Sequence, residues 1–206
     1  VYLFADEFTN YNDADIGIKA VRLLQKLGYD VKIANISESG RSYLSKGFVR
    51  KAKKIAAMNI VDLKDVVLRG IPLLGIEPST ILTFRDEYID LFKPDESMKT
   101  DAQNLAGYSL LIEEFLEKEM REGKIKKELF TNEKKQIRLH GHCQQKAVAS
   151  TDPTKFILSF PENYSVEEIP SGCCGMAGSF GYEEEHYELS MKIGETVLFP
   201  EIRNTN

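Results

Sequence analysis

The chain has 206 residues, which is enough for one large domain or two small ones. Its composition, 42% hydrophobic and 29% charged, is ordinary for a soluble globular protein. A net charge of −5 argues against a general nucleic-acid-binding protein, whose surface would be basic. No apolar run approaches the roughly 20 residues of a membrane span, so we expect a cytoplasmic protein or one held peripherally on the inner membrane. Because Val1 already lies in an apolar run, we expect the chain to begin inside a longer protein.

The first part of the chain alternates short apolar runs with longer stretches of helical periodicity. We expect a first helix that is capped by Asn12 or Asp13 and ended by Gly28, and a third strand that is closed by Pro78. In chain order the pattern predicts the strand VYLFAD, the helix FTNYNDADIGIKAVRLLQKLG, the strand YDVKIA, the turn-rich loop SESGRSYLSKG, the helix FVRKAKKIAAMNIVDLKDVV, the strand IPLLGIE and the helix STILTFRDEYIDLF. Such an alternation indicates parallel βαβ units.

Residues 95–127 interrupt this alternation. Between Asp101 and Glu122 there is no proline, and apolar residues follow one stripe, which predicts one or two connecting helices. We therefore expect a first α/β half at residues 1–94, a helical connection at 95–134 and a second α/β half at 135–206.

The second half repeats the pattern of the first. It predicts the strand QIRLHGH, the helix CQQKAVAS, short elements that include a strand at Val166–Ile169, the glycine-rich loop GCCGMAGSFG and the long helix YEEEHYELSMKIGETVLFPEI. Since the first half continues to the strand PLLGIEPST and the chain stops at Asn206, the last strand is expected to be truncated. The predicted fold class is α/β, with two pseudo-symmetric halves whose mostly parallel, Rossmann-like sheets are flanked by helices.

The three cysteines are the most informative residues for function. Three cysteines are too few for a disulfide framework, and an odd number cannot all pair. Thiols that bind a metal in a reducing compartment agree better with this number. Cys143 follows a predicted strand, and Cys173 and Cys174 lie in a loop between a strand and a helix. Ligands bind beyond the carboxyl ends of strands in open α/β sheets, so we predict that the three thiols converge on a metal. The alternative is that they are small core residues.

The loop around Cys173 suits a bulky inorganic group. Gly172, Gly175 and Gly178 permit close backbone approach, and their amides could donate hydrogen bonds to cluster sulfurs. We interpret Glu183, Glu184 and Glu185 as caps of the next helix rather than as ligands.

His140 and His142 alternate along a predicted strand, so at most one should face the cysteines. We take His142 as the candidate for contact with the cofactor, and hydrogen-bonded structural roles remain open for both residues. His186 is expected to be structural or to support a ligand.

The segments HGHCQQKA and GCCGMAGSFGYEEEHYELSMKIGE resemble the second half of the CCG cysteine-rich domain. That domain occurs in the iron–sulfur subunit of glycolate oxidase and in one subunit each of anaerobic glycerol-3-phosphate dehydrogenase and heterodisulfide reductase. The resemblance is strongest to the C-terminal part of single-chain FAD-linked oxidases, which are similar to D-lactate and other D-2-hydroxyacid dehydrogenases. It implies Cys143, Cys173 and Cys174 as ligands of an iron–sulfur cluster, FAD elsewhere in the parent protein, flavin and ferredoxin-like domains as partners, and a quinone or another electron acceptor.

The first half departs from the family pattern. Glu7, Ser39 and Thr80 stand where the family often has cysteines, so the first half cannot supply thiolates. The fourth ligand of the second half would lie beyond Asn206, and we expect the isolated chain to have low metal occupancy.

We therefore expect an electron-transfer module of an enzyme that oxidises a 2-hydroxyacid such as D-lactate or glycolate. No catalytic residue is assigned in this chain. The main alternative is a zinc-stabilised structural or docking module without a redox role. Thiol redox chemistry between Cys173 and Cys174 ranks last, because a disulfide between adjacent residues is strained.

Overall fold

The computed structural model describes residues 1–36, 38–178 and 180–204. The chain divides into two compact units, Val1–Glu119 and Met120–Asn206, and each unit contains its own sheet. Ser37, the first residue of the predicted loop SESGRSYLSKG, and Ser179, in the glycine-rich loop, lie outside the described residues. None of the helices in the described part of the chain is long and apolar enough to cross a membrane.

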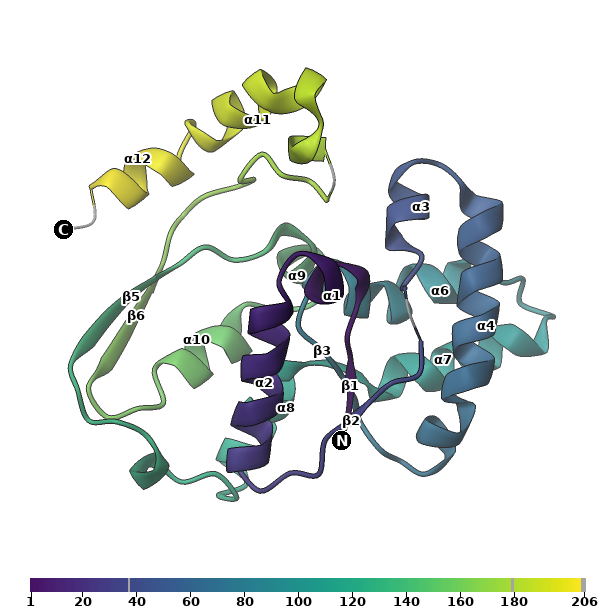
Figure 1. Ribbon diagram of the computed structural model, residues 1–206, viewed down its shortest axis with the longest axis horizontal. Helices are drawn as coiled ribbons and strands as arrows, with labels where there is room; N and C mark the ends of the chain where they lie inside the picture. Colours follow the sequence, from purple (N-terminus) through teal and green to yellow (C-terminus); the bar gives the residue numbers. More distant parts are fainter. Residues whose placement is uncertain (37, 179, 205–206) are drawn as a thin grey trace. The chain divides into compact units, whose positions relative to one another are not determined.

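The sheet of the first unit has four parallel strands in the order β2-β1-β3-β4, which confirms the predicted α/β class. Helices flank this sheet (Figure 1). Leu3 lies opposite Ile33 on one side and opposite Leu74 on the other. The strands are β1 (Tyr2–Phe4), β2 (Lys32–Ile33), β3 (Leu73–Gly75) and β4 (Ser109–Leu111).

The helices of this unit follow the predicted order, with three differences. The predicted helix STILTFRDEYIDLF is divided into α5, the 3₁₀ helix η1 and α6. The predicted first helix is divided into α1 and α2 at Asp13, which occupies the N-cap position of α2. The predicted loop at residues 37–47 contains the short helix α3. The bounds are α1 (Glu7–Tyr11), α2 (Ala14–Lys26), α3 (Arg41–Ser45), α4 (Val49–Leu68), α5 (Pro78–Ile81), the 3₁₀ helix η1 (Leu82–Phe84), α6 (Glu87–Asp90), α7 (Ser97–Tyr108) and α8 (Ile112–Arg121), which runs past the boundary of the unit.

The strand β4 lies in the segment that was expected to be only helical. Ser109–Leu111 is a short apolar run between two helices, and a run of that length does not distinguish strand from helix. Its pairing with β3 requires residues that are far away in the sequence. This contact adds the fourth strand to the sheet.

The core of the first unit lies around β1 and β3. Leu3, Phe4, Leu73 and Leu74 are almost completely buried. Aromatic rings extend this core, because the ring centroid of Phe84 lies 5.3 Å from that of Phe4 and 4.7 Å from that of Tyr88. Burial of such side chains contributes about 1.5–3 kcal/mol each.

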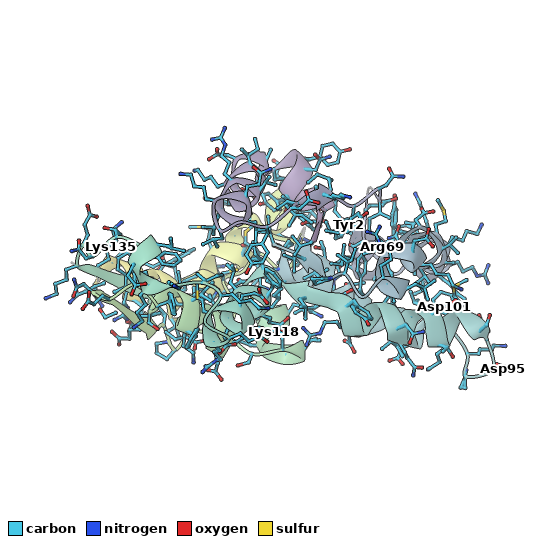
Figure 2. The ribbon with its side chains drawn as sticks, turned by 90° about the horizontal axis from the view of Figure 1, so that it is seen from below. Tyr2, Arg69, Asp95, Asp101, Lys118 and Lys135 are labelled. Carbon is cyan, nitrogen blue, oxygen red and sulfur yellow. The ribbon has the colours of Figure 1, made fainter. Side chains whose placement is uncertain are left out.

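Helices α4 and α7 pack against each other, and an ion pair joins them at the surface. Lys64 Nζ lies 3.3 Å from Asp101 Oδ2. Asp101 is labelled on α7 in Figure 2. Exposed pairs of this kind contribute roughly 0–1 kcal/mol, so packing rather than charge holds the two helices together.

The second unit contains two parallel strands, which run side by side in Figure 1. Strand β5 (Lys135–Leu139) begins at the residue labelled Lys135 in Figure 2 and pairs along its whole length with β6 (Tyr164–Glu168). The predicted strand at Val166–Ile169 therefore begins earlier than expected. The other elements are the 3₁₀ helices η2 (Lys127–Leu129), η3 (Phe180–Tyr182) and η4 (Glu184–His186), and the helices α9 (Cys143–Val148), α10 (Asp152–Leu158), α11 (Tyr187–Gly194) and α12 (Leu198–Arg203).

The predicted long C-terminal helix is broken into η4, α11 and α12. The break after Gly194 has a packing reason. A Cβ at Gly194 would lie 2.4 Å from Cζ of Phe199, so only glycine lets the Phe199 ring pack this closely against the end of α11. Helical periodicity on either side of such a break does not reveal it.

Candidate metal site at the cysteines

Cys143 is the first residue of α9, directly after the loop that follows β5. His142 is the N-cap residue, and its Nδ1 accepts a hydrogen bond from the backbone N–H of Gln144 at 3.2 Å. His142 is thereby tied to the start of the helix that carries Cys143. The N-terminus of a helix favours the thiolate form of a cysteine.

His140 and His142 lie in the loop after β5 and not on a strand, because β5 ends at Leu139. His140 Nδ1 lies 2.6 Å from Oγ of Ser171, in the segment that leads to Cys173. Burial lowers the pKa of His140, with smaller contributions from Lys146 and His142, which favours a neutral, hydrogen-bonded ring. This arrangement agrees with the structural role that was left open for His140.

Gly141 lets the loop pass close to the end of β6. A Cβ at this position would lie 2.6 Å from Cγ2 of Thr151 and 2.9 Å from Oε1 of Glu168. Any larger residue would displace the loop that positions Cys143.

Cys173 and Cys174 lie in the loop between β6 and η3. The loop begins beside β5, because the Ile169 N–H donates to the Leu139 carbonyl at 2.8 Å. Parallel pairing thus brings the segments after both strands to the same edge of the sheet.

The glycines of this loop serve backbone conformation and close packing. Gly175 has φ +97°, and a Cβ there would lie 2.2 Å from the Ser190 carbonyl oxygen. Its N–H donates to Cys173 Sγ at 3.3 Å. Gly178 also has a positive φ, +67°, whereas nothing lies within 4 Å of a Cβ built on Gly172.

The three thiols lie close enough to affect one another. Cys143 Sγ is 3.8 Å from the Gly172 carbonyl oxygen, next to Cys173 in the chain. The pKa of the Cys143 thiol is raised, first by burial and then by the charge of Cys173, a hydrogen bond with it, and the charge of Cys174. Mutual repulsion of this kind would be relieved by a cation bound among the thiolates.

Three thiols are suitable ligands for a soft metal. Their side chains are not arranged around a common metal position. Within residues 1–36, 38–178 and 180–204, no group of three or more His, Cys, Asp or Glu side chains is arranged to hold a metal ion. All three cysteines are free thiols, with Cys143 exposed and the other two half-buried. Thiolates are the preferred ligands of zinc and of iron–sulfur clusters, and neighbouring amides such as that of Gly175 are typical donors to cluster sulfurs.

The first unit has a corresponding site without thiols. Glu7 is the first residue of α1, as Cys143 is of α9, and Ser39 precedes Gly40 as Cys174 precedes Gly175. Gly40 shares the left-handed conformation, with φ +81°. Ser39 donates to Glu7 twice, from its backbone N–H at 2.9 Å and from Oγ at 2.7 Å.

Thr80, the third residue that was predicted at a cysteine position, is buried in α5. Its Oγ1 donates to the Glu77 carbonyl at 2.9 Å, which satisfies the hydroxyl within its own helix. Thr80 therefore has a local structural role in the first unit.

Two residues of the first-unit site were not found from the sequence. Asp6 caps α1 and accepts hydrogen bonds from the backbone N–H groups of Phe8 and Thr9. Tyr88 donates its hydroxyl to the Ser39 carbonyl at 2.7 Å. An aspartate directly before a helix is a recognisable cap signal, whereas nothing in the sequence connects Tyr88 with Ser39.

The fold and the site define an α/β protein whose cysteines gather after two parallel strands. Along nearly its whole length the chain is similar to dehydrogenase proteins. It is 28% identical to D-2-hydroxyglutarate dehydrogenase of Pantoea ananatis over 98% of the chain, and 29% identical to that of Escherichia coli over 95%. It is 27% identical to a subunit of the anaerobic glycerol-3-phosphate dehydrogenase of Escherichia coli over 100% of the chain.

The chain spans only part of each of these relatives. It covers 19% and 18% of the two D-2-hydroxyglutarate dehydrogenases and 50% of the glycerol-3-phosphate dehydrogenase subunit. No protein-family model matches the chain, and no solved structure matches it. The similarity supports an oxidoreductase module.

Proposed function

We propose that this chain is the electron-transfer module of a larger oxidoreductase that oxidises a 2-hydroxyacid such as D-lactate or glycolate. The observation that carries the proposal is the gathering of Cys143, Cys173 and Cys174 at the carboxyl ends of two parallel strands. The full-length similarity to proteins named as dehydrogenases supports the same class.

Cys143, Cys173 and Cys174 would hold an iron–sulfur cluster, with another ligand from outside this set. Such a cluster supplies one-electron transfer. The chain's own residues would set its surroundings, since the Gly175 N–H donates to Cys173 Sγ and His142 caps the helix that presents Cys143. The Gly172, Gly175 and Gly178 backbone would let the loop approach the inorganic group.

FAD would bind elsewhere in the whole protein, where the 2-hydroxyacid loses two electrons and two protons to become a 2-oxoacid. The flavin and ferredoxin-like domains would be the partners of this chain, and a quinone or another acceptor would receive the electrons. The small shares that the chain covers of its dehydrogenase relatives support this placement within a larger assembly.

The second candidate is a zinc-stabilised docking module. It is favoured by the same thiols together with the absence of thiols from the first-unit site, where Glu7 and Ser39 pair with each other. A single site of three thiolates and one further ligand is a common zinc arrangement.

Metal analysis and visible spectroscopy of the full-length protein, purified without oxygen, decide between the two. We expect iron–sulfur absorbance and iron, with loss of the share that belongs to this site in Cys143→Ser, Cys173→Ser and Cys174→Ser, while the flavin and the ferredoxin-like domain keep theirs. Ser42→Ala, at an exposed position of the first unit, is the control and should keep the iron. Zinc that is lost when the three cysteines are substituted, with iron unchanged by the same substitutions, would establish the docking module. Protein in which neither metal depends on these cysteines would contradict both functions.

A further inference from the structure

Lys146 lies on α9 one turn after Cys143, so the two side chains emerge from neighbouring positions on the helix surface. Its ammonium group reaches across to the segment that precedes Cys173. Nζ donates to the Ser171 carbonyl at 2.9 Å and lies 3.4 Å from the Gly172 carbonyl. One lysine therefore connects the helix of the first cysteine with the loop of the other two.

The segment that Lys146 holds is itself part of the thiol environment. The Gly172 carbonyl is the group that Cys143 Sγ contacts at 3.8 Å. Ser171 is buried, and its Oγ is already engaged by His140. His140 thus holds the Ser171 side chain, and Lys146 holds the Ser171 backbone against α9.

The aliphatic stem of Lys146 passes beside Gly141, which Thr151 and Glu168 approach more closely. A Cβ built on Gly141 would lie 3.4 Å from Cδ of the lysine. The stem thus passes along the loop between β5 and α9 before the ammonium group reaches the two carbonyls.

The charge of Lys146 is placed among the thiols. Its ammonium group lies 3.4 Å from the Gly172 carbonyl oxygen, which Cys143 Sγ approaches at 3.8 Å. Three thiolates would gather negative charge in one place, and a nearby ammonium group offsets part of it.

We infer that Lys146 is a positioning residue of the cysteine site, which fixes the 171–172 segment against α9 and offsets the charge of the bound thiolates. This inference rests on the proposed metal-binding function and names the residue that supports the ligands. Groups outside the ligand set typically contribute 10–100-fold to metal affinity.

The test uses Lys146→Met, which keeps the length of the stem but removes the charge and the donors, and Lys146→Arg, which keeps both. Lys192→Met, on an exposed position of α11, is the matched control. The affinity of the full-length protein for Co²⁺ is measured by competition with a chelator, and the thiolate-to-cobalt absorption reports the ligands. We expect about 10–100-fold weaker binding and altered absorption in Lys146→Met, tighter binding in Lys146→Arg than in Lys146→Met, and wild-type behaviour in Lys192→Met.

Hydrogen exchange of the metal-free protein provides a readout that does not depend on metal. We expect faster amide exchange at Gly172–Gly175 in Lys146→Met than in the wild type or in Lys192→Met. Wild-type Co²⁺ affinity and wild-type exchange in Lys146→Met would overturn the inference. Wild-type protein that binds neither Co²⁺ nor iron would overturn the proposed function, and the anchoring role of Lys146 would then be decided by the exchange result.

Discussion

Ser39 donates two hydrogen bonds to the Glu7 carboxylate, one from its backbone N–H at 2.9 Å and one from Oγ at 2.7 Å. The corresponding positions of the second unit hold Cys143 and Cys174. In the first unit a direct hydrogen bond therefore joins the loop to the start of the helix, where the second unit would use a shared metal. The first-unit site can keep its loop in place without any ligand.

Ser39→Ala should destabilise the first unit. The hydroxyl is completely buried and donates to a carboxylate, and loss of such a bond destabilises by about 1.5–3 kcal/mol. Urea denaturation measures the change. Ser42→Ala, at an exposed position of the next helix, should change the free energy of unfolding by less than about 0.5 kcal/mol. Equal effects of the two substitutions would contradict the role of the Glu7–Ser39 bond.

Asp6→Asn should flatten the dependence of stability on pH. Burial raises the pKa of Asp6 above its ordinary value of 3.8, against the opposing effect of its hydrogen bonds. A raised folded-state pKa means that the stability contribution of the group is complete below 3.8 and is lost as pH rises through the folded-state pKa.

The free energy of unfolding of the wild type should therefore fall more steeply than that of Asp6→Asn as the pH rises above about 4. Asparagine keeps the cap to the backbone N–H groups through its Oδ1, whereas the Thr9 hydroxyl loses its acceptor, Asp6 Oδ2, at 2.6 Å. The dependence of the difference on pH, rather than its size at one pH, therefore reports the charge. Denaturation curves at several pH values measure the two slopes. If the free energy of unfolding had the same pH dependence in Asp6→Asn and in the wild type, a raised pKa of Asp6 would be excluded.

Gly175→Ala should disrupt the cysteine loop. Its φ of +97° is unfavourable for alanine, and the added Cβ would lie 2.2 Å from the Ser190 carbonyl oxygen. We expect a loss of about 1–3 kcal/mol in stability together with loss of metal binding. Thermal unfolding and Co²⁺ titration of the full-length protein measure both effects.

Gly172→Ala is the neighbouring control, because nothing lies within 4 Å of its added Cβ. It should retain the stability of the loop, since the added Cβ meets no other atom. If Gly175→Ala behaved like Gly172→Ala, the close approach of the loop to α11 would not constrain the site.

Tyr88→Phe should destabilise the first unit by about 1–3 kcal/mol, because it leaves the buried Ser39 carbonyl without its donor. The hydroxyl also accepts a hydrogen bond from Nδ2 of Asn59 at 2.8 Å. Chemical denaturation measures the loss. Tyr11→Phe, at a side chain that is 79% exposed, should leave the free energy of unfolding unchanged. An unchanged free energy of unfolding in Tyr88→Phe would contradict the role of the Tyr88 hydroxyl in holding the loop.

Much of the fold could be predicted because its signals are local. Buried strands such as β3 are short apolar runs between turn residues, and α4 has a long helical periodicity. The strand β4 and the break after Gly194 could not be predicted. The first depends on pairing with β3 and the second on the ring of Phe199, and both partners act through space.

The candidate site divides in the same way. The sequence by itself determined the α/β alternation, because residue identity and spacing carry that information. It also predicts thiol chemistry at Cys143, Cys173 and Cys174, and the resemblance implies that Glu7, Ser39 and Thr80 stand at cysteine positions. Only the tertiary structure decided that Ser39 binds Glu7, and that Lys146 reaches the segment before Cys173. Such contacts follow from parallel strands that bring distant loops to one edge of a sheet, and the positions of side chains at that edge depend on packing that no local pattern encodes.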